Sequence, residues 1–157
     1  IDVFDINPLP SEDGTLSEYY INTGARHFVK FVRGIYDIDV NKEGPVYRWQ
    51  ERFAPLGVNT NFTEPVEKGK LEVRTFEKGI EAETYACGTG TVACCIANYL
   101  MGTPAEELPD GRVKYAVHAK IDNLAVDFIP TEENGKPFMK DVWLTGPATF
   151  VATVEFA

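Results

Sequence analysis

The chain has 157 residues, of which 44% are hydrophobic and 25% charged, and its formal net charge is −9. This length and composition predict one folded domain, residues 1–157, and exclude a disordered chain. No stretch concentrates lysine and arginine, which argues against a nucleic-acid partner, and no apolar run approaches the roughly 20 residues of a membrane span. We expect a soluble cytoplasmic protein with an acidic surface. Because the chain starts at Ile1 without a methionine, we also expect that an upstream segment is missing.

The N-terminal half contains several short runs with the alternation of β-strands. We predict strands at Val3–Ile6, Tyr19–Asn22, His27–Val32, Gly57–Val66 and Leu71–Phe76. The second and third strands would pair across the turn at Thr23–Arg26, and the last two around Glu67–Lys70.

Two pieces between these strands have other patterns. Ile35–Val40 alternates and is short. The apolar residues Val46, Trp49 and Phe53 recur at helical spacing, with a proline before them and another after them. This spacing predicts a short helix over 46–53.

A longer helix is predicted from Gly88 to Met101, with Gly102 and Pro104 as its stop signals. Its segment VACCIANYLM carries almost no charge on any face. A helix that is apolar all round must be buried on most sides.

The C-terminal third again reads as strands joined by turns. We predict a loop at Thr103–Gly111, a hairpin of Val113–Ala119 and Leu124–Ile129, a charged tip at Thr131–Lys136, and a closing pair of strands, Val142–Thr145 and Ala148–Phe156. The count of eight or nine short strands and one long apolar helix predicts an α+β fold. In it, a curved, mostly antiparallel sheet or barrel wraps around one central buried helix, with the shorter helix outside.

The three cysteines are Cys87, Cys94 and Cys95. An odd number, with two adjacent residues in a predicted buried helix, argues against a disulfide framework. No CxxC or paired His/Cys spacing indicates a metal site, and a reducing compartment is the simplest setting. We expect Cys94 and Cys95 to be packing residues.

Cys87 stands at or just before the N-terminus of the long helix. Unpaired N–H groups and the positive end of the helix dipole converge there, which favours an anion and lowers the pKa of a thiol. The run Gly88-Thr89-Gly90-Thr91 suits close approach of a carboxylate. The alternative is that the two glycines only permit a tight turn from strand to helix.

The two histidines of the chain are candidates for assisting a thiol. His118 alternates with Val117 and shares a face with Lys114 and Ala116, so we expect a surface or structural role. His27 follows a turn and can reach a site, although its spacing alone does not favour a functional role.

The run RTFEKG, followed by ETYACGTGT, resembles the signature of the C-terminal half of diaminopimelate epimerases. Three further segments resemble that family in the same order: Asn22–His27, Val58–Phe62 and Gly146–Thr149. The resemblance covers nearly the whole chain. It implies a PLP-independent amino-acid epimerase, without a cofactor or metal, built of two similar halves that each curl a sheet around a central helix.

The resemblance also implies how such an enzyme works. The active site lies between the halves and each half gives one cysteine, so that one thiolate removes the α-proton and the other thiol delivers a proton to the opposite face. The implied substrate is LL- or meso-diaminopimelate, of lysine biosynthesis. This chain would be a C-terminal half that lacks its N-terminal partner half and is inactive alone.

The match implies roles for individual residues. As catalytic residues it indicates Cys87 as one acid/base thiol, Glu77 as a carboxylate near the thiols and the substrate ammonium, and His27 as an aid to the thiol of the missing half. As substrate-binding residues it indicates Gly88, Thr89 and Gly90 for the α-carboxylate, Lys78 and Glu77 for charged groups, and Asn59 for the distal amino-acid head.

The sequence departs from the family pattern at Lys78, where arginine is usual, and at Ala25 and Arg26, which replace a polar residue and a proline. One extra residue also lies between Gly79 and Glu83. These changes bear on substrate identity more than on reaction type.

Two other functions stay open. One is a non-catalytic module that binds a small carboxylate or a partner chain, and the other is a thiol hydrolase or redox protein that uses Cys87 with His27. A half-protein should also expose the apolar face that its other half covers, so we expect self-association, such as a homodimer.

Overall fold

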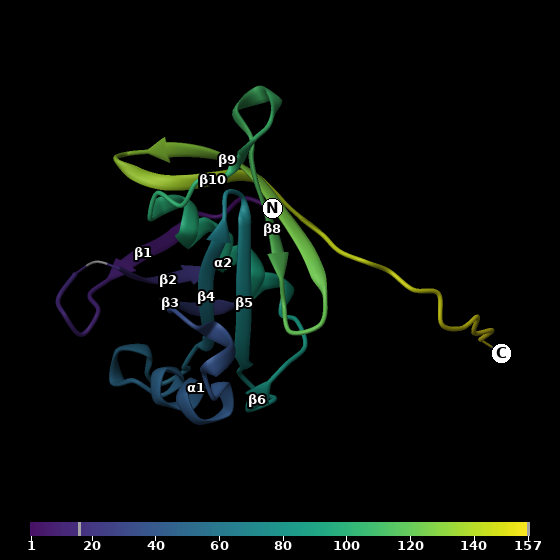
Figure 1. Cartoon of the computed structure of the whole chain (residues 1–157), viewed down its shortest axis with the longest axis horizontal. Helices are drawn as coiled ribbons and strands as arrows, with labels where there is room; N and C mark the ends of the chain where they lie inside the picture. The colour runs from purple at the N-terminus through teal and green to yellow at the C-terminus, as the bar shows by residue number, and fades with distance from the viewer. Residues whose placement is uncertain (16, 157) are drawn as a thin grey trace.

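The structure, a computed structural model, describes residues 1–15 and 17–156. In this part of the chain, ten strands form one sheet that curls around the helix α2 (Gly88–Leu100), as Figure 1 shows. The main path of the sheet follows the spatial order β1 (Asp5–Leu9), β2 (Glu18–Asn22), β3 (Arg26–Phe31), β4 (Asn59–Glu67), β5 (Lys70–Glu77), β8 (Val113–His118), β9 (Asn123–Glu133) and β10 (Lys136–Thr145). The two-residue strands β6 (Ala82–Glu83) and β7 (Glu106–Glu107) pair with β5 and β8.

Most neighbouring strands of this sheet run antiparallel, but β3 pairs with β4 and β5 pairs with β8 in parallel. The curl brings the two ends of the sheet together. Val3, just before β1, exchanges two backbone hydrogen bonds of 2.8 Å with Met139 of β10. The predicted α+β class, a curved and mostly antiparallel sheet around one central helix, is confirmed.

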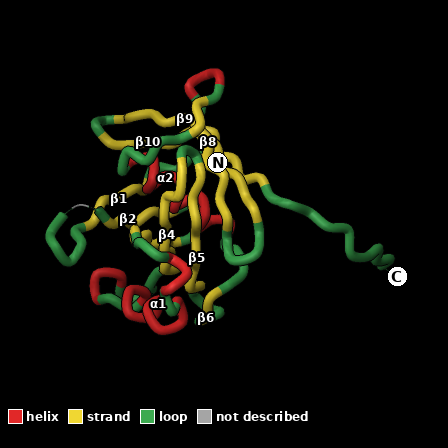
Figure 2. The backbone as a smooth tube through the Cα atoms, in the orientation of Figure 1, coloured by secondary structure: helices red, strands yellow, loops and turns green. Residues whose placement is uncertain are grey.

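Helix α2 fills the inside of the curl, where Figure 2 shows its red tube among the strands. Its residues Val92–Ala97 are at most 4% exposed and pack on side chains such as Val29, Tyr115 and Phe128 of the surrounding strands. Each fully buried side chain the size of valine or isoleucine stabilises the fold by about 1.5–3 kcal/mol. The prediction of a buried helix is therefore confirmed. Among the described residues, no helix is long and apolar enough to cross a membrane.

Helix α1 (Val40–Arg48) lies on the outer face of the sheet, but the predicted span 46–53 is wrong. The helix begins six residues earlier because the side chain of Asp39 caps it by accepting a hydrogen bond of 3.2 Å from the Lys42 N–H. Pro45 thus lies inside α1 and does not start it. Residues Glu51–Phe53 form a separate 3₁₀ turn, η2.

The short alternating segment Ile35–Val40 forms no strand. Ile35–Asp37 form the 3₁₀ turn η1. Its start is held by the Glu64 carboxylate, which accepts hydrogen bonds of 3.1 and 2.9 Å from the N–H groups of Gly34 and Ile35. A contact with a residue so far along the chain overrides the local pattern.

The hairpin of β9 and β10 is longer than predicted. The expected tip at Thr131–Lys136 shrinks to Asn134-Gly135, whose φ values of 52° and 74° are those of a two-residue type I′ turn. The predicted loop at Thr103–Gly111 holds β7 and the 3₁₀ turn η3 (Pro109–Gly111).

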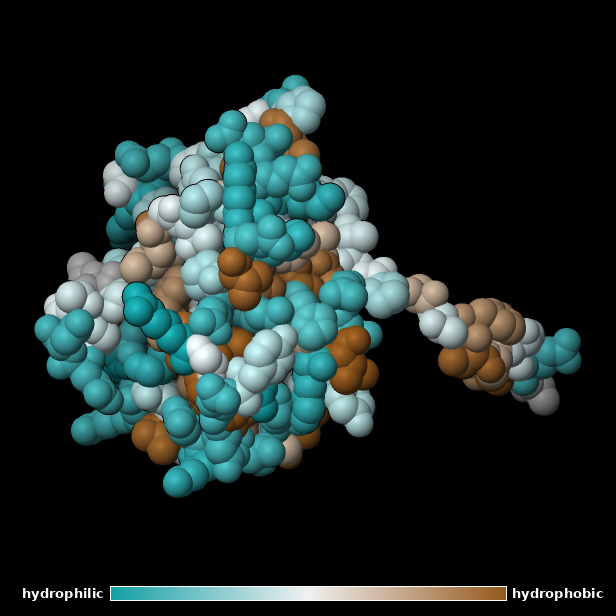
Figure 3. Space-filling view, viewed as in Figure 1, coloured by the Kyte–Doolittle hydropathy of each residue, from teal (hydrophilic) through white to brown (hydrophobic). Residues whose placement is uncertain are grey.

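The predicted closing strand at Ala148–Phe156 is wrong. Strand β10 takes β9 as its partner, with Trp143 opposite Asp127, so no second strand is needed there. Residues 146–156 carry no strand and leave the body of the molecule, as Figure 1 shows at its yellow end. Figure 3 shows hydrophobic atoms in this tail, where Phe150 and Phe156 are 83% and 95% exposed.

Candidate active site

A polar pocket of about 420 Å³ opens where the N-terminus of α2 meets the end of β5 and the turn between β2 and β3. Its lining consists of Gly24, Ala25, Arg26, Asn59, Glu77, Lys78, Gly79, Cys87 and Thr89. The fold thus gathers residues that are far apart in the sequence into one place. Of the eight residues predicted to be catalytic or substrate-binding, five line this pocket; His27, Gly88 and Gly90 are not part of its lining.

Cys87 is the N-cap residue of α2 and has extended backbone angles, φ −120° and ψ 105°. The first helical hydrogen bond runs from the Thr91 N–H to the Cys87 carbonyl, at 2.8 Å. Helix geometry leaves the N–H groups of Gly88, Thr89 and Gly90 without an intrahelical acceptor, at the positive end of the dipole. The half-buried thiol therefore stands beside a place suited to a carboxylate.

His27 lies behind this helix turn and is fully buried. One ring nitrogen, Nε2, is 2.9 Å from Thr89 Oγ1, and the other, Nδ1, is 3.1 Å from Asn61 Nδ2. Burial lowers the pKa of His27 to about 4. The ring is therefore neutral at pH 7.

Asn59 ties the two walls of the pocket together. Its amide donates a hydrogen bond of 2.9 Å to the Arg26 carbonyl and accepts one of 2.8 Å from the Lys78 N–H. Glu77 ends β5 and the exposed Lys78 follows it, so one acidic and one basic residue line the same pocket. The amide of Asn59 thus fixes the backbone at Lys78 relative to Arg26.

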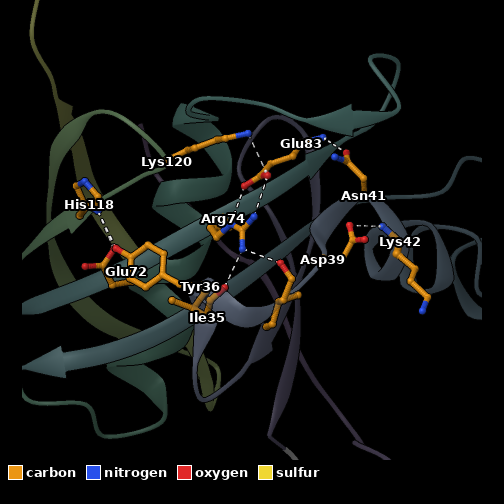
Figure 4. Close-up of polar contacts among 11 residues, drawn as sticks. Ile35, Tyr36, Asp39, Asn41, Lys42, Glu72, Arg74, Glu83, His118 and Lys120 are labelled. Atoms are coloured by element: carbon orange, nitrogen blue, oxygen red, sulfur yellow. Dashed lines mark hydrogen bonds and ion pairs between the residues drawn. The ribbon is translucent and has the colours of Figure 1, made fainter.

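The segment that leads into Cys87 is anchored at Glu83, whose contacts with Arg74 and Lys120 are drawn in Figure 4. The Arg74 guanidinium grips the Glu83 carboxylate with two hydrogen bonds, of 2.7 and 2.9 Å, and Lys120 adds a third of 3.2 Å. Burial acts to raise the pKa of Glu83, but these bonds outweigh it and hold the pKa below its ordinary value. Arg74 also donates to the carbonyls of Ile35 and Ile38, so the anchor reaches η1.

Gly90 allows α2 to lie close against Asn61 and His27 of the sheet. A Cβ atom at this position would lie 2.3 Å from Asn61 Oδ1 and 3.3 Å from His27 Cε1. We expect Gly90→Ala to lower the free energy of unfolding by about 1–3 kcal/mol, because neither the strand nor the helix can move away freely. Urea denaturation of the chain measures this loss.

The matched control is Gly88→Ala, two residues earlier in the same turn. Its Cβ would meet only Leu144 Cδ2, at 2.7 Å, and that is the mobile end of a side chain. This variant should lose less than about 1 kcal/mol, the range of a volume change that side chains can absorb. Equal losses in both variants would contradict the tight contact at Gly90.

The other cysteines and the second histidine lie apart from this pocket. Cys94 and Cys95 are fully buried in the core, and burial raises the pKa of both thiols. The His118 ring contacts Glu72, with Nδ1 2.8 Å from the carboxylate, and Tyr36. Among the described residues that line the pocket around Cys87, none is Cys94, Cys95 or His118.

Two threonines of the site were not singled out from the sequence. Thr75 Oγ1 donates a hydrogen bond of 2.9 Å to Asn61 Oδ1, and Thr23 Oγ1 donates one of 3.0 Å to the Thr89 carbonyl. Thr75 looks like any inward residue of an alternating strand. Thr23 lies in the predicted turn before His27, but that turn does not indicate a contact with α2.

A curled sheet around one helix, with a thiol at the helix N-terminus beside a polar pocket, defines a class of protein that can hold a small anion next to a cysteine. The family model described as diaminopimelate epimerase matches residues 19–134. The chain therefore belongs to the diaminopimelate epimerase family.

Several relatives named diaminopimelate epimerase are similar to this chain. The protein of a Hydrogenobaculum species is 40% identical over 145 residues, which cover 91% of this chain and 47% of that protein. The Aquifex aeolicus protein is 48% identical over 83 residues, 53% of this chain and 30% of that one. The Chlorobaculum tepidum protein is 33% identical over 138 residues, which cover 88% of this chain and 49% of that protein. The chain thus spans about half, or less, of the length of these curated relatives.

One solved structure is similar in shape, that of a Bacillus anthracis phenazine biosynthesis protein of the PhzF family. It matches with a TM-score of 0.48 and 20% identity, over 88% of this chain and 39% of that chain. This similarity is too distant to bear on function.

Proposed function

We propose that this chain is the C-terminal half of a cofactor-independent, two-thiol amino-acid epimerase that interconverts LL- and meso-diaminopimelate. The observation that carries the proposal is the position of Cys87, at the N-terminus of α2 and in one pocket with Glu77, Lys78 and Thr89. Membership of the family and the names of its relatives suggest the substrate.

In the proposed reaction, Cys87 handles the α-proton on one face of the substrate. In one direction its thiolate takes the proton, so that the C–H bond breaks and an S–H bond forms. A thiol of the second half then gives its proton to the opposite face, and the reverse direction exchanges the two roles. The negative charge that develops spreads into the α-carboxylate, where the N–H groups of Gly88, Thr89 and Gly90 stabilise it.

The remaining residues of the pocket hold the substrate. Lys78 attracts a carboxylate and Glu77 an ammonium group, while Asn59 sets the wall on which both stand. Lysine is a point charge and does not make the two-pronged grip of arginine. Arg26, which also lines the pocket, adds a second cation for the two carboxylates of diaminopimelate.

The second half of the enzyme is the proposed partner. Apolar side chains stand exposed on the chain, among them Phe4, Tyr85, Trp143 and Leu144. A contiguous patch of exposed apolar groups is typical of a surface that another chain or domain covers, and we propose that these side chains contribute to one. The role of His27 as an aid to the thiol of that half stays a prediction.

The experiment combines this chain with the N-terminal half of the Hydrogenobaculum relative and measures the interconversion of LL- and meso-diaminopimelate. We expect interconversion by the combined halves and none by either half alone, because inversion needs a thiol on each face. Stable association of the halves, with substrate bound but never inverted, would favour the non-catalytic module instead.

A further inference from the structure

A row of hydrogen-bonding side chains leads from the interior of the sheet to Cys87. It begins at Thr75 on β5, passes through Asn61 on β4 and His27 on β3, and ends at Thr89 on the first turn of α2. Thr89 Oγ1 lies 3.6 Å from Cys87 Sγ, within hydrogen-bonding reach of a sulfur atom. All members except Thr89 are buried.

The acceptors around Asn61 set the direction of this row. The Phe28 carbonyl, which can only accept, lies 2.9 Å from Asn61 Nδ2, so the amide nitrogen faces that side. The amide oxygen then faces Thr75 and accepts from its hydroxyl. The second N–H of Asn61 points at His27 Nδ1.

This orientation decides the tautomer of His27. A ring nitrogen that faces an N–H group must be the acceptor, so Nδ1 carries no proton and the neutral ring holds its proton on Nε2. Nε2–H therefore donates to Thr89 Oγ1. With its oxygen occupied as an acceptor, the Thr89 hydroxyl is left to donate its own proton toward Cys87 Sγ.

We propose that Thr75, Asn61 and His27 are positioning residues that aim the Thr89 hydroxyl at the sulfur of Cys87 and so stabilise its thiolate. Every hydrogen bond of the row donates in the same direction, toward the sulfur, and successive bonds of this kind polarise one another. A hydrogen bond to the charged form of a group favours that form. The inference rests on the proposed function only for the use of the thiolate, since the row itself acts on Cys87 in the isolated chain.

The test measures the rate at which iodoacetamide alkylates Cys87 in the full chain, by mass spectrometry, across a range of pH. Cys94 and Cys95 are fully buried, so the folded chain reacts at Cys87. We expect Thr89→Val, which removes only the hydroxyl, to move the profile to higher pH and to slow alkylation at pH 7 by roughly threefold to tenfold. Thr89→Ser, which keeps a hydroxyl, should restore most of the rate.

Two further variants separate the row from general effects. Thr91→Val removes a neighbouring hydroxyl that donates a hydrogen bond of 2.9 Å to the Cys87 carbonyl and not to its sulfur. This variant should leave the profile unchanged. His27→Phe removes the donor to Thr89 and should shift the profile in the same direction as Thr89→Val, by less. The charged residues that line the pocket, Arg26, Glu77 and Lys78, are unchanged in every variant, so their effect on the thiol is common to all of them.

An unchanged profile in Thr89→Val would overturn the inference, and so would equal shifts in Thr89→Val and Thr89→Ser. A shift in Thr89→Val without any in His27→Phe would show that the hydroxyl acts alone and would overturn the positioning role of the row. These outcomes are independent of the proposed function, which fails instead if the combined halves invert no substrate.

Discussion

Replacing Cys87 with alanine should lower the rate of inversion by the combined halves at least about 1000-fold. A positioned acid or base typically accelerates a proton transfer by about 10²–10⁴-fold, and in the proposed reaction Cys87 is the base in one direction and the acid in the other. Substrate binding should change little, because the helix N–H groups and Lys78 remain. Initial rates in both directions, with the dissociation constant measured on the same sample, separate the two effects.

The matched control is Cys95→Ala, which removes another thiol of the same helix. Cys95 is fully buried in the core and lies away from the pocket. This variant should keep the inversion rate within about threefold and lose only some stability. If both variants lose inversion equally, the loss comes from the fold and not from the chemistry of Cys87.

The second large effect concerns the stability of the chain in acid. The pKa of His27 falls from 6.5 to about 4 on folding because the ring is buried. As the pH drops below about 6.5, the unfolded chain binds a proton that the folded chain refuses, so the free energy of unfolding decreases. At 1.36 kcal/mol per pH unit, the loss reaches about 3 kcal/mol near pH 4 and then levels off.

Urea denaturation between pH 7 and pH 4 measures this loss as the difference between the unmodified chain and His27→Phe. Subtraction of the two curves removes the carboxylates that titrate in the same range. His118→Gln is the control, because His118 is partly exposed and its variant should keep the acid-dependent loss. Parallel curves for the unmodified chain and His27→Phe would show that His27 is protonated in the folded state and would contradict its burial as a neutral ring.

Much of the fold follows from local patterns. The apolar segment Val92–Ala97 is buried on all sides, and the strands around it curl to cover it. Hairpins such as β4 and β5 follow from their turns. The patterns fail where a group distant in the sequence determines the local backbone conformation. At Ile35, for example, the N–H donates to the Glu64 carboxylate.

The pocket is only partly predictable. Cys87 and its glycines stand out because their spacing marks a helix start, and the family resemblance adds Glu77 and Lys78. The row behind Thr89 depends on sheet register. Strands β3 and β4 run parallel with His27 opposite Asn59, and β4 and β5 run antiparallel with Asn61 opposite Thr75. The β4–β5 register follows from the hairpin turn, but no local pattern reports the register between β3 and β4, which lie far apart in the sequence.

Deuterium exchange by the Cys87→Ala variant of the combined halves tests most directly whether Cys87 serves one face of the substrate. In deuterated solvent, the unmodified halves should introduce deuterium at the reacting α-carbon of both stereoisomers. In the variant, we expect deuterium in only the stereoisomer whose α-hydrogen faces the other thiol, without inversion. Deuterium entering both stereoisomers at unchanged rates would contradict the role of Cys87.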